Sequence, residues 1–240
     1  YYPNKLENAF KMRYAVVMGQ KSQLFFELTP ADTFRLFKEL YRIPDGEYKR
    51  SVGYFVELFG VSEFMDVQVR TLSLGERMKM ELIVALLLDP GVLFLVEPTI
   101  GLDAAAQRQI RVFLREVNAQ KGTTILLTSY YMEDVRSLCP RSVVINGGKK
   151  LYDGSTEELF AAYQTHKKIT VTFDRETAFD APPNAEILEQ NPYKSAFMIP
   201  KTESGAALSA VMSRYSPADI SVEEEDIGAV VERIYAGGGV

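Results

Sequence analysis

Short runs of apolar residues recur along the chain and are separated by longer stretches in which apolar residues follow a helical spacing. The runs lie at residues 13–18, 92–96 and 123–129. Continuous apolar runs of this length are typical of strands that are buried on both faces of a parallel sheet. Because helical patterns separate the runs, the sequence predicts an α/β fold with a parallel sheet at its core.

The helical stretches are bounded by residues that favour helix ends. Thr29-Pro30 supplies an N-cap and a proline at the first helical position, and Gly60 and Gly122 are suited to end helices. The expected helices begin at Thr29-Pro30, cover Val52 to Phe59, begin again at Gly75 and run from about Ala104 to Ala119. The aromatic residues of the first helical layer, Phe25, Phe26, Phe34 and Phe37, are expected to be mainly core residues, although some are candidates for contact with a partner.

The pattern changes after Tyr163, where short alternating runs replace the α/β alternation. Just before it, Gly147-Gly148 predicts a hairpin, and Ser155 with Glu158 predicts a capping box. Beyond it, KKITVTF and KSAFMIP are expected to be strands separated by a loop, followed by helices near 203–214 and 227–235, a strand near 219–222 and a disordered tail at 237–239. These elements predict a second, smaller α+β module without evident chemistry.

Composition excludes several classes of function. The net charge is −5 with no long run of Lys or Arg, so there is no electrostatic footprint for nucleic acid. One cysteine, Cys139, excludes an internal disulfide. The longest apolar run, residues 82–96, is broken by Asp89-Pro90-Gly91 and is too short to span a membrane. We therefore expect neither a nucleic-acid partner nor a membrane span.

Three motifs follow one another between residues 72 and 103: LSLGE at 72–76, VLFLVEPT at 92–99 and GLD at 101–103. They resemble the signature motif, the Walker B strand and the D-loop of ATP-binding cassette (ABC) ATPases. The segments GQKSQL, YRIPD, RTLSLGERMKMEL and TSYYMEDV resemble bacterial ABC-2-type exporter ATPases over about two thirds of the chain. This resemblance implies a P-loop NTPase sheet with a helical subdomain at about residues 21–75, an ABC ATPase domain over 1–163 and a C-terminal module over 164–240.

The resemblance also implies a nucleotide site that is shared between two subunits packed head to tail. Gln20 matches the Q-loop glutamine, which approaches Mg²⁺. In the signature motif, Ser73 would donate its hydroxyl to the γ-phosphate of ATP, and Leu74 and Gly75 would present backbone N–H groups at a helix N-terminus. Leu72 and Glu76 complete that motif. Glu97 matches the catalytic carboxylate that polarises the attacking water, and Asp103 matches the D-loop aspartate that crosses the dimer seam.

Three features depart from the family pattern. The phosphate-binding loop GxxxxGK[ST] is absent from the chain. Val96 replaces the Walker B aspartate and cannot accept a hydrogen bond from metal-bound water. Tyr130 replaces the switch histidine, and its phenol is a poor proton carrier near neutral pH. These departures fall in one half-site, whereas Ser73, Gly75 and Asp103 of the other half-site are retained.

Two accounts of these departures stay open, and they decide whether the chain is an enzyme. In the first, the chain, which begins at Tyr1 and not at methionine, is an N-terminally truncated fragment of an ATPase. In the second, it is a degenerate subunit that lends its signature motif to an intact partner and does not hydrolyse ATP itself. A soluble, non-transport ABC ATPase is a third alternative, against which the acidic charge and the short interval from Gln20 to Ser73 argue.

The resemblance therefore implies the ATP-binding subunit of an ABC-type exporter that couples ATP hydrolysis to export. The expected cofactors are ATP and Mg²⁺. The expected partners are membrane subunits and a second ATPase subunit, in a homodimer or heterodimer on the cytoplasmic face of the membrane. Neither the transported substrate nor the direction of transport follows from the residues.

Overall fold

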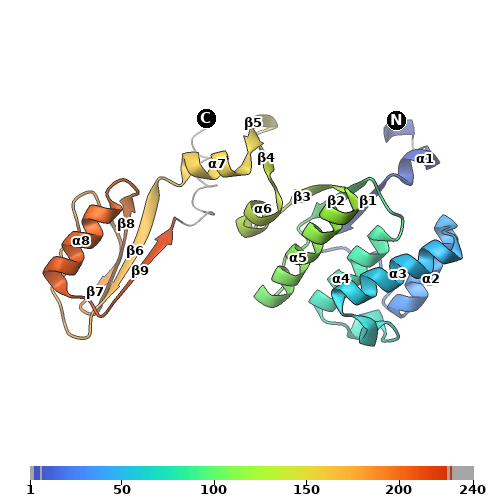
Figure 1. Ribbon diagram of the computed structural model, residues 1–240, viewed down its shortest axis with the longest axis horizontal. Coiled ribbons are helices and arrows are strands. Elements are labelled where there is room, and N and C mark those ends of the chain that lie inside the picture. Colours follow the sequence, from blue (N-terminus) through green and yellow to red (C-terminus); the bar gives the residue numbers. More distant parts are fainter. Residues whose placement is uncertain (1–2, 6, 226–227, 229–240) are drawn as a thin grey trace. The chain divides into compact units, whose positions relative to one another are not determined.

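The computed structural model describes residues 3–5, 7–225 and 228. Its contacts divide the chain into two compact units, Tyr1–Cys139 and Pro140–Val240 (Figure 1). This division falls earlier in the chain than the domain boundary predicted after residue 163, which stays a prediction. The helix predicted near 227–235 and the tail at 237–239 lie outside the described residues.

The first unit is built on a parallel sheet in the order β1-β2-β3, with β1 at Tyr14–Met18, β2 at Val92–Val96 and β3 at Thr124–Thr128. The predicted parallel core is confirmed. Three residues that stand in register across the sheet at its carboxyl end are Met18, Val96 and Thr128. Because parallel strands end at the same edge, the loops that follow β1, β2 and β3 all leave the sheet there.

Two helices lie between β1 and β2 in the sequence, α2 at Pro30–Tyr41 and α3 at Asp45–Phe59. Thr29 caps α2 as predicted, because its Oγ1 accepts the Asp32 N–H at 3.1 Å. Gly60 ends α3 with φ +62°, a conformation that costs glycine little. The sequence pattern predicts the start of this helix at Val52, whereas the structure begins it at Asp45, directly after Pro44 at the N-cap.

Helices α4 (Leu74–Leu86) and α5 (Ala104–Lys121) pack on the same face of the sheet (Figure 1). Their apolar residues form one core with the inward residues of β1 and β2 and with the phenylalanines of α2 and α3. In it, Phe59 stacks on Phe113 of α5 at 3.6 Å between ring centroids. Phe34 is fully buried, as expected of a core residue.

The opposite face of this sheet is apolar, and its side chains are only partly covered within the described residues. The exposed fractions are 41% for Met18, 37% for Phe94, 41% for Val96 and 50% for Leu126. The alternation along β2, in which Leu93 and Leu95 are buried and Phe94 and Val96 are exposed, follows from the two-residue period of a strand.

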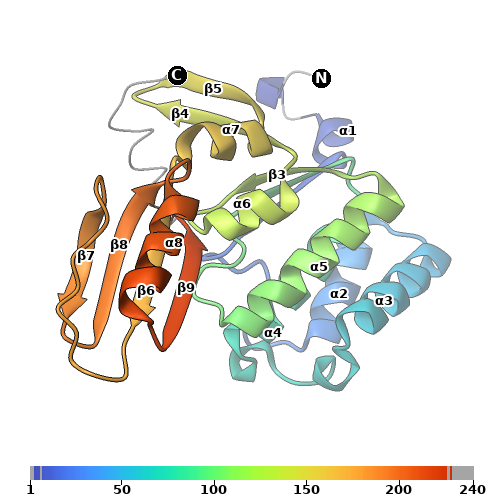
Figure 2. The same ribbon diagram turned by 60° about the vertical axis from the view of Figure 1, so that its left-hand side comes forward.

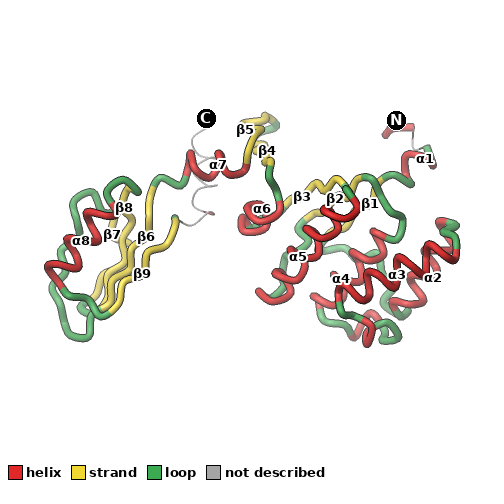
Figure 3. Tube along the Cα trace, in the orientation of Figure 1, coloured by secondary structure: helices red, strands yellow, loops and turns green. Residues whose placement is uncertain are grey.

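Shorter elements complete the first unit (Figure 3). They are a 3-10 turn at Pro3–Lys5, α1 at Asn8–Lys11, 3-10 turns at Ser62–Phe64 and Val69–Thr71, and α6 at Met132–Leu138. Across the described part of the chain, no helix combines the length and apolar composition needed to cross a membrane.

The second unit begins with the predicted hairpin, β4 at Arg141–Asn146 and β5 at Lys149–Ser155, which turns at Gly147-Gly148. Helix α7 follows at Thr156–Tyr163. Ser155 Oγ accepts the Glu158 N–H at 3.4 Å, which is one of the two hydrogen bonds of the predicted capping box.

A four-stranded antiparallel sheet in the order β7-β8-β6-β9 forms the rest of this unit, with α8 at Ser204–Tyr215 on one face (Figure 2). Its strands are β6 at His166–Thr172, β7 at Glu186–Asn191, β8 at Lys194–Pro200 and β9 at Asp219–Glu224. Strand β7 was expected to be loop. All of its residues are exposed, so it has no apolar pattern that a sequence could reveal.

Candidate functional site

The signature-like motif forms the N-terminus of α4, where Ser73 is the N-cap. Ser73 Oγ accepts the Glu76 N–H at 3.3 Å, and Glu76 Oε2 accepts the Ser73 N–H at 2.7 Å, which makes a complete capping box. These bonds leave the N–H groups of Leu74 and Gly75 without an acceptor inside the helix. Leu72 is buried and ends the preceding 3-10 turn. The motif therefore presents free backbone donors at the positive end of a helix dipole.

The GLD loop packs tightly against this helix start. A Cβ placed on Gly75 would lie 3.1 Å from Ala106 Cβ, and one on Gly101 would lie 3.2 Å from Leu74 Cδ2. Gly101 also has φ +74°, which favours glycine. Asp103 caps α5, since its Oδ1 accepts the Ala106 N–H at 2.8 Å. The two motifs thus bring the N-termini of α4 and α5 together.

Gln20 lies in the exposed turn that follows β1, and the glycine before it sets the position of this turn. The Gly19 N–H donates to Val96 O at 2.8 Å, and a Cβ at position 19 would lie 2.0 Å from Glu97 O. Only glycine allows this approach without movement of the backbone. The close contact places the Gln20 turn next to the end of β2.

Glu97 follows β2 directly and is fixed through both its backbone and its side chain. Its N–H donates to Thr128 O at 2.9 Å, and its carboxylate Oε2 accepts the Tyr130 N–H at 2.8 Å. Its φ of +52° lies in the left-handed region, which a non-glycine residue adopts at a cost of about 1 kcal/mol or more. The half-buried carboxylate is therefore held at the carboxyl edge of the sheet, beside the Gln20 turn.

The two residues that depart from the family pattern lie at the same edge with exposed side chains. Val96 is 41% exposed on the open face of the sheet, and the Tyr130 side chain is 80% exposed. The phenol of Tyr130 is therefore mostly open to solvent, and the backbone N–H of this residue donates to Glu97.

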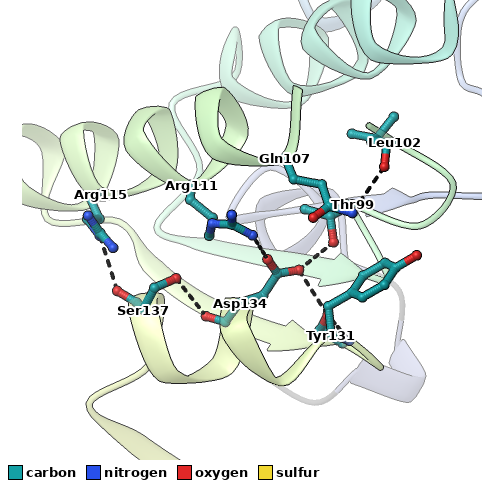
Figure 4. Close-up of polar contacts among 9 residues, drawn as sticks. Thr99, Leu102, Gln107, Arg111, Arg115, Tyr131, Asp134 and Ser137 are labelled. Atoms are coloured by element: carbon teal, nitrogen blue, oxygen red, sulfur yellow. Dashed lines mark hydrogen bonds and ion pairs between the residues drawn. The ribbon is translucent and has the colours of Figure 1, made fainter. Parts of the chain in front are cut away.

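Behind this edge of the sheet, Asp134 of α6 links the loop after β2, the residue after β3 and helix α5 (Figure 4). This fully buried carboxylate accepts hydrogen bonds from the Thr99 hydroxyl and from Ser129 Oγ, the latter at 2.9 Å. It also pairs with Arg111 Nη1 of α5 at 2.7 Å. Since Thr99 follows Glu97 and Ser129 precedes Tyr130, Asp134 fixes the two loops that meet at the Glu97 carboxylate.

The structure brings the predicted residues together in two groups. The group at the helix starts contains Ser73, Leu74, Gly75, Glu76 and Asp103. The group at the strand ends contains Gln20, Glu97 and the backbone of Tyr130. Sequence reasoning did not single out Gly19, Thr99, Arg111 or Asp134. A glycine directly after an apolar strand and an aspartate near the end of TSYYMEDV were the available signals.

The strand-end group has the donors that a nucleotide-bound magnesium ion uses. Glu97 offers a carboxylate and Gln20 an amide oxygen, whereas Val96 offers none. Mg²⁺ is commonly held by one or two protein oxygens together with substrate phosphates, so this donor set fits an ion that arrives with a nucleotide. Within the described residues, no group of three His, Cys, Asp or Glu side chains gathers that could hold an ion alone.

Solved ATP-binding subunits of ABC transporters share the fold described above. Over 68% of this chain and 67% of its own, a solved ATP-binding subunit of an ABC transporter superposes with a TM-score of 0.58 at 22% identity. The cbiO1 protein from Clostridium perfringens, part of the cbiONQ transporter complex, gives the same TM-score at 23% identity over 64% of this chain and 61% of its own. At these identities the two structures confirm the α/β fold.

Sequence comparison supplies curated relatives. The ABC transporter ATP-binding protein NatA of Bacillus subtilis (strain 168) is 31% identical over 150 residues, 62% of this chain and 61% of NatA. The Nod factor export ATP-binding protein I of Ralstonia nicotianae is 34% identical over 149 residues, 62% of this chain and 46% of the relative. The methionine import ATP-binding protein MetN of Haemophilus ducreyi is 33% identical over 149 residues, 62% of this chain and 43% of MetN.

These relatives are ABC transporter ATP-binding proteins, and the resemblance inferred from the motifs is confirmed. No protein-family model matches the chain. The chain spans about three fifths of NatA and less than half of the other two relatives. Both an exporter and an importer are among the relatives, so they do not fix a direction of transport.

Proposed function

We propose that this chain forms part of the ATP-binding subunit of an ABC-type exporter and binds ATP at a head-to-tail dimer interface. The observation that carries the proposal is the pair of adjoining helix starts at Ser73 and Asp103, which are capped and packed together at Gly75 and Gly101. A helix start of this kind binds phosphate through its free N–H groups and dipole. It would engage the γ-phosphate of a nucleotide that is bound by the other subunit.

The capping geometry of Ser73 is compatible with this role. In the capping box the Ser73 hydroxyl oxygen accepts a hydrogen bond, so its own hydrogen stays available for donation to a phosphate oxygen. Leu74 and Gly75 add backbone donors, and the close fit at Gly75 leaves room for no larger residue without a shift. The motif can therefore bind phosphate without first rearranging.

At the strand ends, Glu97 would accept a proton from the attacking water while Gln20 contacts the nucleotide-bound Mg²⁺. The metal would supply charge neutralisation at the phosphates. The Tyr130 N–H holds the Glu97 carboxylate on one oxygen and leaves the other free to accept the water proton.

Exposed aromatic residues next to the Gln20 turn support a membrane-subunit partner. Phe25 is 49% exposed and Phe26 is 46% exposed, in contrast to the buried Phe34. The Arg77 guanidinium of α4 lies 5.5 Å from the centre of the Phe26 ring. We place the contact with the membrane subunit here, on the cytoplasmic face, where it would sense the turn that carries Gln20.

The test is dimerisation in Mg-ATP, followed by analytical ultracentrifugation. Both Ser73→Asn and Ser73→Asp keep a residue suited to the N-cap, but aspartate places a negative charge where the γ-phosphate would bind. We expect the aspartate variant to abolish the ATP-dependent dimer and the asparagine variant to retain part of it. Ser155→Asp, at the cap of α7, is the matched control and should dimerise as the wild type does. Equal dimerisation of all three variants would refute the phosphate role of Ser73.

A second candidate, a subunit that lends its signature motif to a partner without hydrolysing ATP, is favoured by Val96 and by the exposed Tyr130 side chain. The two candidates differ at Glu97. In the transporter, Glu97→Gln should reduce turnover by about 10²-fold or more if Glu97 acts as a base. It should leave turnover unchanged if only the partner hydrolyses ATP.

A further inference from the structure

Glu81 is a buried carboxylate in the middle of α4, and it binds the loop that follows Gln20. Its Oε1 accepts hydrogen bonds from the Ser22 hydroxyl and from the Gln23 N–H, the latter at 2.9 Å. Its Oε2 accepts the same Gln23 N–H at 3.0 Å, and the Leu24 N–H lies 3.4 Å from Oε1. One side chain therefore takes the donors of three consecutive residues.

Glu81 is buried, so its charge depends on these hydrogen bonds. The residue is 2% exposed and lies in an otherwise apolar stretch of α4. A carboxylate is rarely buried to this extent unless it is fully hydrogen-bonded, because desolvation penalises the charge. Arg77 stands one helical turn earlier, but no salt bridge links it to Glu81 within the described residues. The loop donors are thus the main partners of the charge.

The contact joins the two groups of the candidate site. On one side the loop begins at Gln20, and Gln23 anchors it to β1 through its side-chain amide, which donates to Val16 O at 2.7 Å. On the other side α4 begins at the signature-like motif. A small cavity of about 60 Å³ lies between them, lined by Gln20 and Ser22 of the loop and by Leu74, Arg77 and Glu81 of the helix.

We propose that Glu81 is a positioning residue that holds the segment carrying Gln20 against the signature-like helix. Removal of its oxygens would leave three donors without their acceptor and release the loop, although α4 itself would persist. Because Gln20 and Ser73 are assigned to nucleotide contacts only by the proposed function, the relevance of Glu81 to nucleotide binding rests on that function. The positioning itself does not.

The experiment is hydrogen exchange of backbone amides in the full chain, compared among the wild type, Glu81→Met and Glu81→Gln. Methionine has a similar shape and no strong acceptor, so we expect the Gln23 and Leu24 amides to exchange about tenfold faster or more. Glutamine retains one acceptor oxygen and should restore part of the protection. Amides of α5, to which Glu81 makes no hydrogen bond within the described residues, should keep their rates. Glu57→Met, the same change at an exposed position of α3, is the matched control and should alter none of these rates.

Two outcomes would overturn the proposal: unchanged exchange at Gln23 and Leu24 in Glu81→Met, or an equal acceleration throughout α4 and α5. The second would mean that Glu81 stabilises the unit as a whole. Repeating the wild-type measurement with Mg-ATP separates this question from the proposed function. If the nucleotide protects neither residues 19–24 nor residues 73–76, the proposed function fails, while the comparison of variants still decides the role of Glu81.

Discussion

The two halves of the candidate site are built differently. At the helix starts, the side chains of Ser73 and Asp103 are themselves the caps that form the local structure. At the strand ends, the local structure depends on backbone contacts at Gly19 and Glu97 and on the buried Asp134, while the side chains of Val96 and Tyr130 are exposed.

Under the proposed function, this difference explains how one half of the site keeps the family residues while the other departs from the family pattern. A change at Ser73 or Gly75 disturbs a cap or a close contact, so the fold restricts the same residues as the proposed phosphate contact. A change at position 96 or 130 alters an exposed side chain and leaves the strand ends intact. We infer that the strand-end half can lose catalytic side chains at little cost in stability.

The largest effect is expected for Gly19→Ala, which tests whether the strand ends depend on backbone packing. The added Cβ would lie 2.0 Å from Glu97 O and 2.8 Å from Ile100 Cγ2, so the ends of β1 and β2 would have to separate. We expect a loss of about 3 kcal/mol in the free energy of unfolding, measured by urea denaturation. Gly53→Ala in α3, where a Cβ meets nothing within 4 Å, should instead stabilise by about 0.5 kcal/mol. If both variants proved equally stable, the strand ends would not be close-packed.

Thr99→Val should have a smaller effect and tests the role of Asp134. Valine fills a similar volume but removes a buried hydroxyl that donates to this carboxylate. The expected cost is about 2 kcal/mol in unfolding free energy, since hydrogen bonds to charged groups are the stronger ones. The control is Thr124→Val at an exposed position of β3, which should change stability by less than about 0.5 kcal/mol. A neutral Thr99→Val would leave the loops at Glu97 without their proposed anchor.

Much of the fold could be predicted from sequence because local chemistry and tertiary structure agree in the first unit. The apolar runs became β1, β2 and β3, and Thr29, Gly60 and Gly122 bound helices as expected. The exposed strand β7 and the short helix α6 escaped prediction, since neither has an apolar period long enough to detect. The opposite failure occurs at Phe25 and Phe26, which are hydrophobic but exposed. Their hydrophobicity alone does not reveal this exposure.

The candidate site was predictable where it is local in sequence. Ser73 and Asp103 act within one helical turn of their partners, so the motif and the geometry coincide. Glu81 binds groups that lie 57–59 residues away in sequence, and Asp134 binds Thr99, which lies 35 residues away; no short motif encodes those pairings. Gly19 is of the same kind, because its requirement for glycine comes from Glu97, which directly follows the neighbouring strand.

Val96→Asp tests the strand-end half of the site by adding the carboxylate that the family pattern has at this position. Val96 is exposed at the end of β2, so an aspartate there would be solvated and cost little stability. If nucleotide binds here with Mg²⁺, we expect the Mg²⁺-dependent affinity for ATP to rise about tenfold, or about 1.4 kcal/mol, in isothermal titration calorimetry. Phe94→Asp adds the same charge to the same face two residues earlier and should give no such rise. An equal rise in both variants would indicate unspecific attraction of cations.

The smallest effect is the pH dependence that Glu81 contributes, and it decides whether burial or hydrogen bonding dominates where the two halves meet. Burial raises the pKa of Glu81 above its ordinary value of 4.5, and the hydrogen bonds from Ser22, Gln23 and Leu24 oppose this only in part. A raised pKa in the folded state means that protonation favours folding. The contribution of Glu81 to stability is therefore fully present below about pH 4.5 and is lost as the pH rises through the folded-state pKa. Glutamine does not titrate, so the unfolding free energy of the wild type minus that of Glu81→Gln should fall over this range and then level off. Glu57→Gln, the same change at an exposed position of α3, is the matched control. A difference that instead grows with pH would show that the three loop donors outweigh the cost of burying the charge.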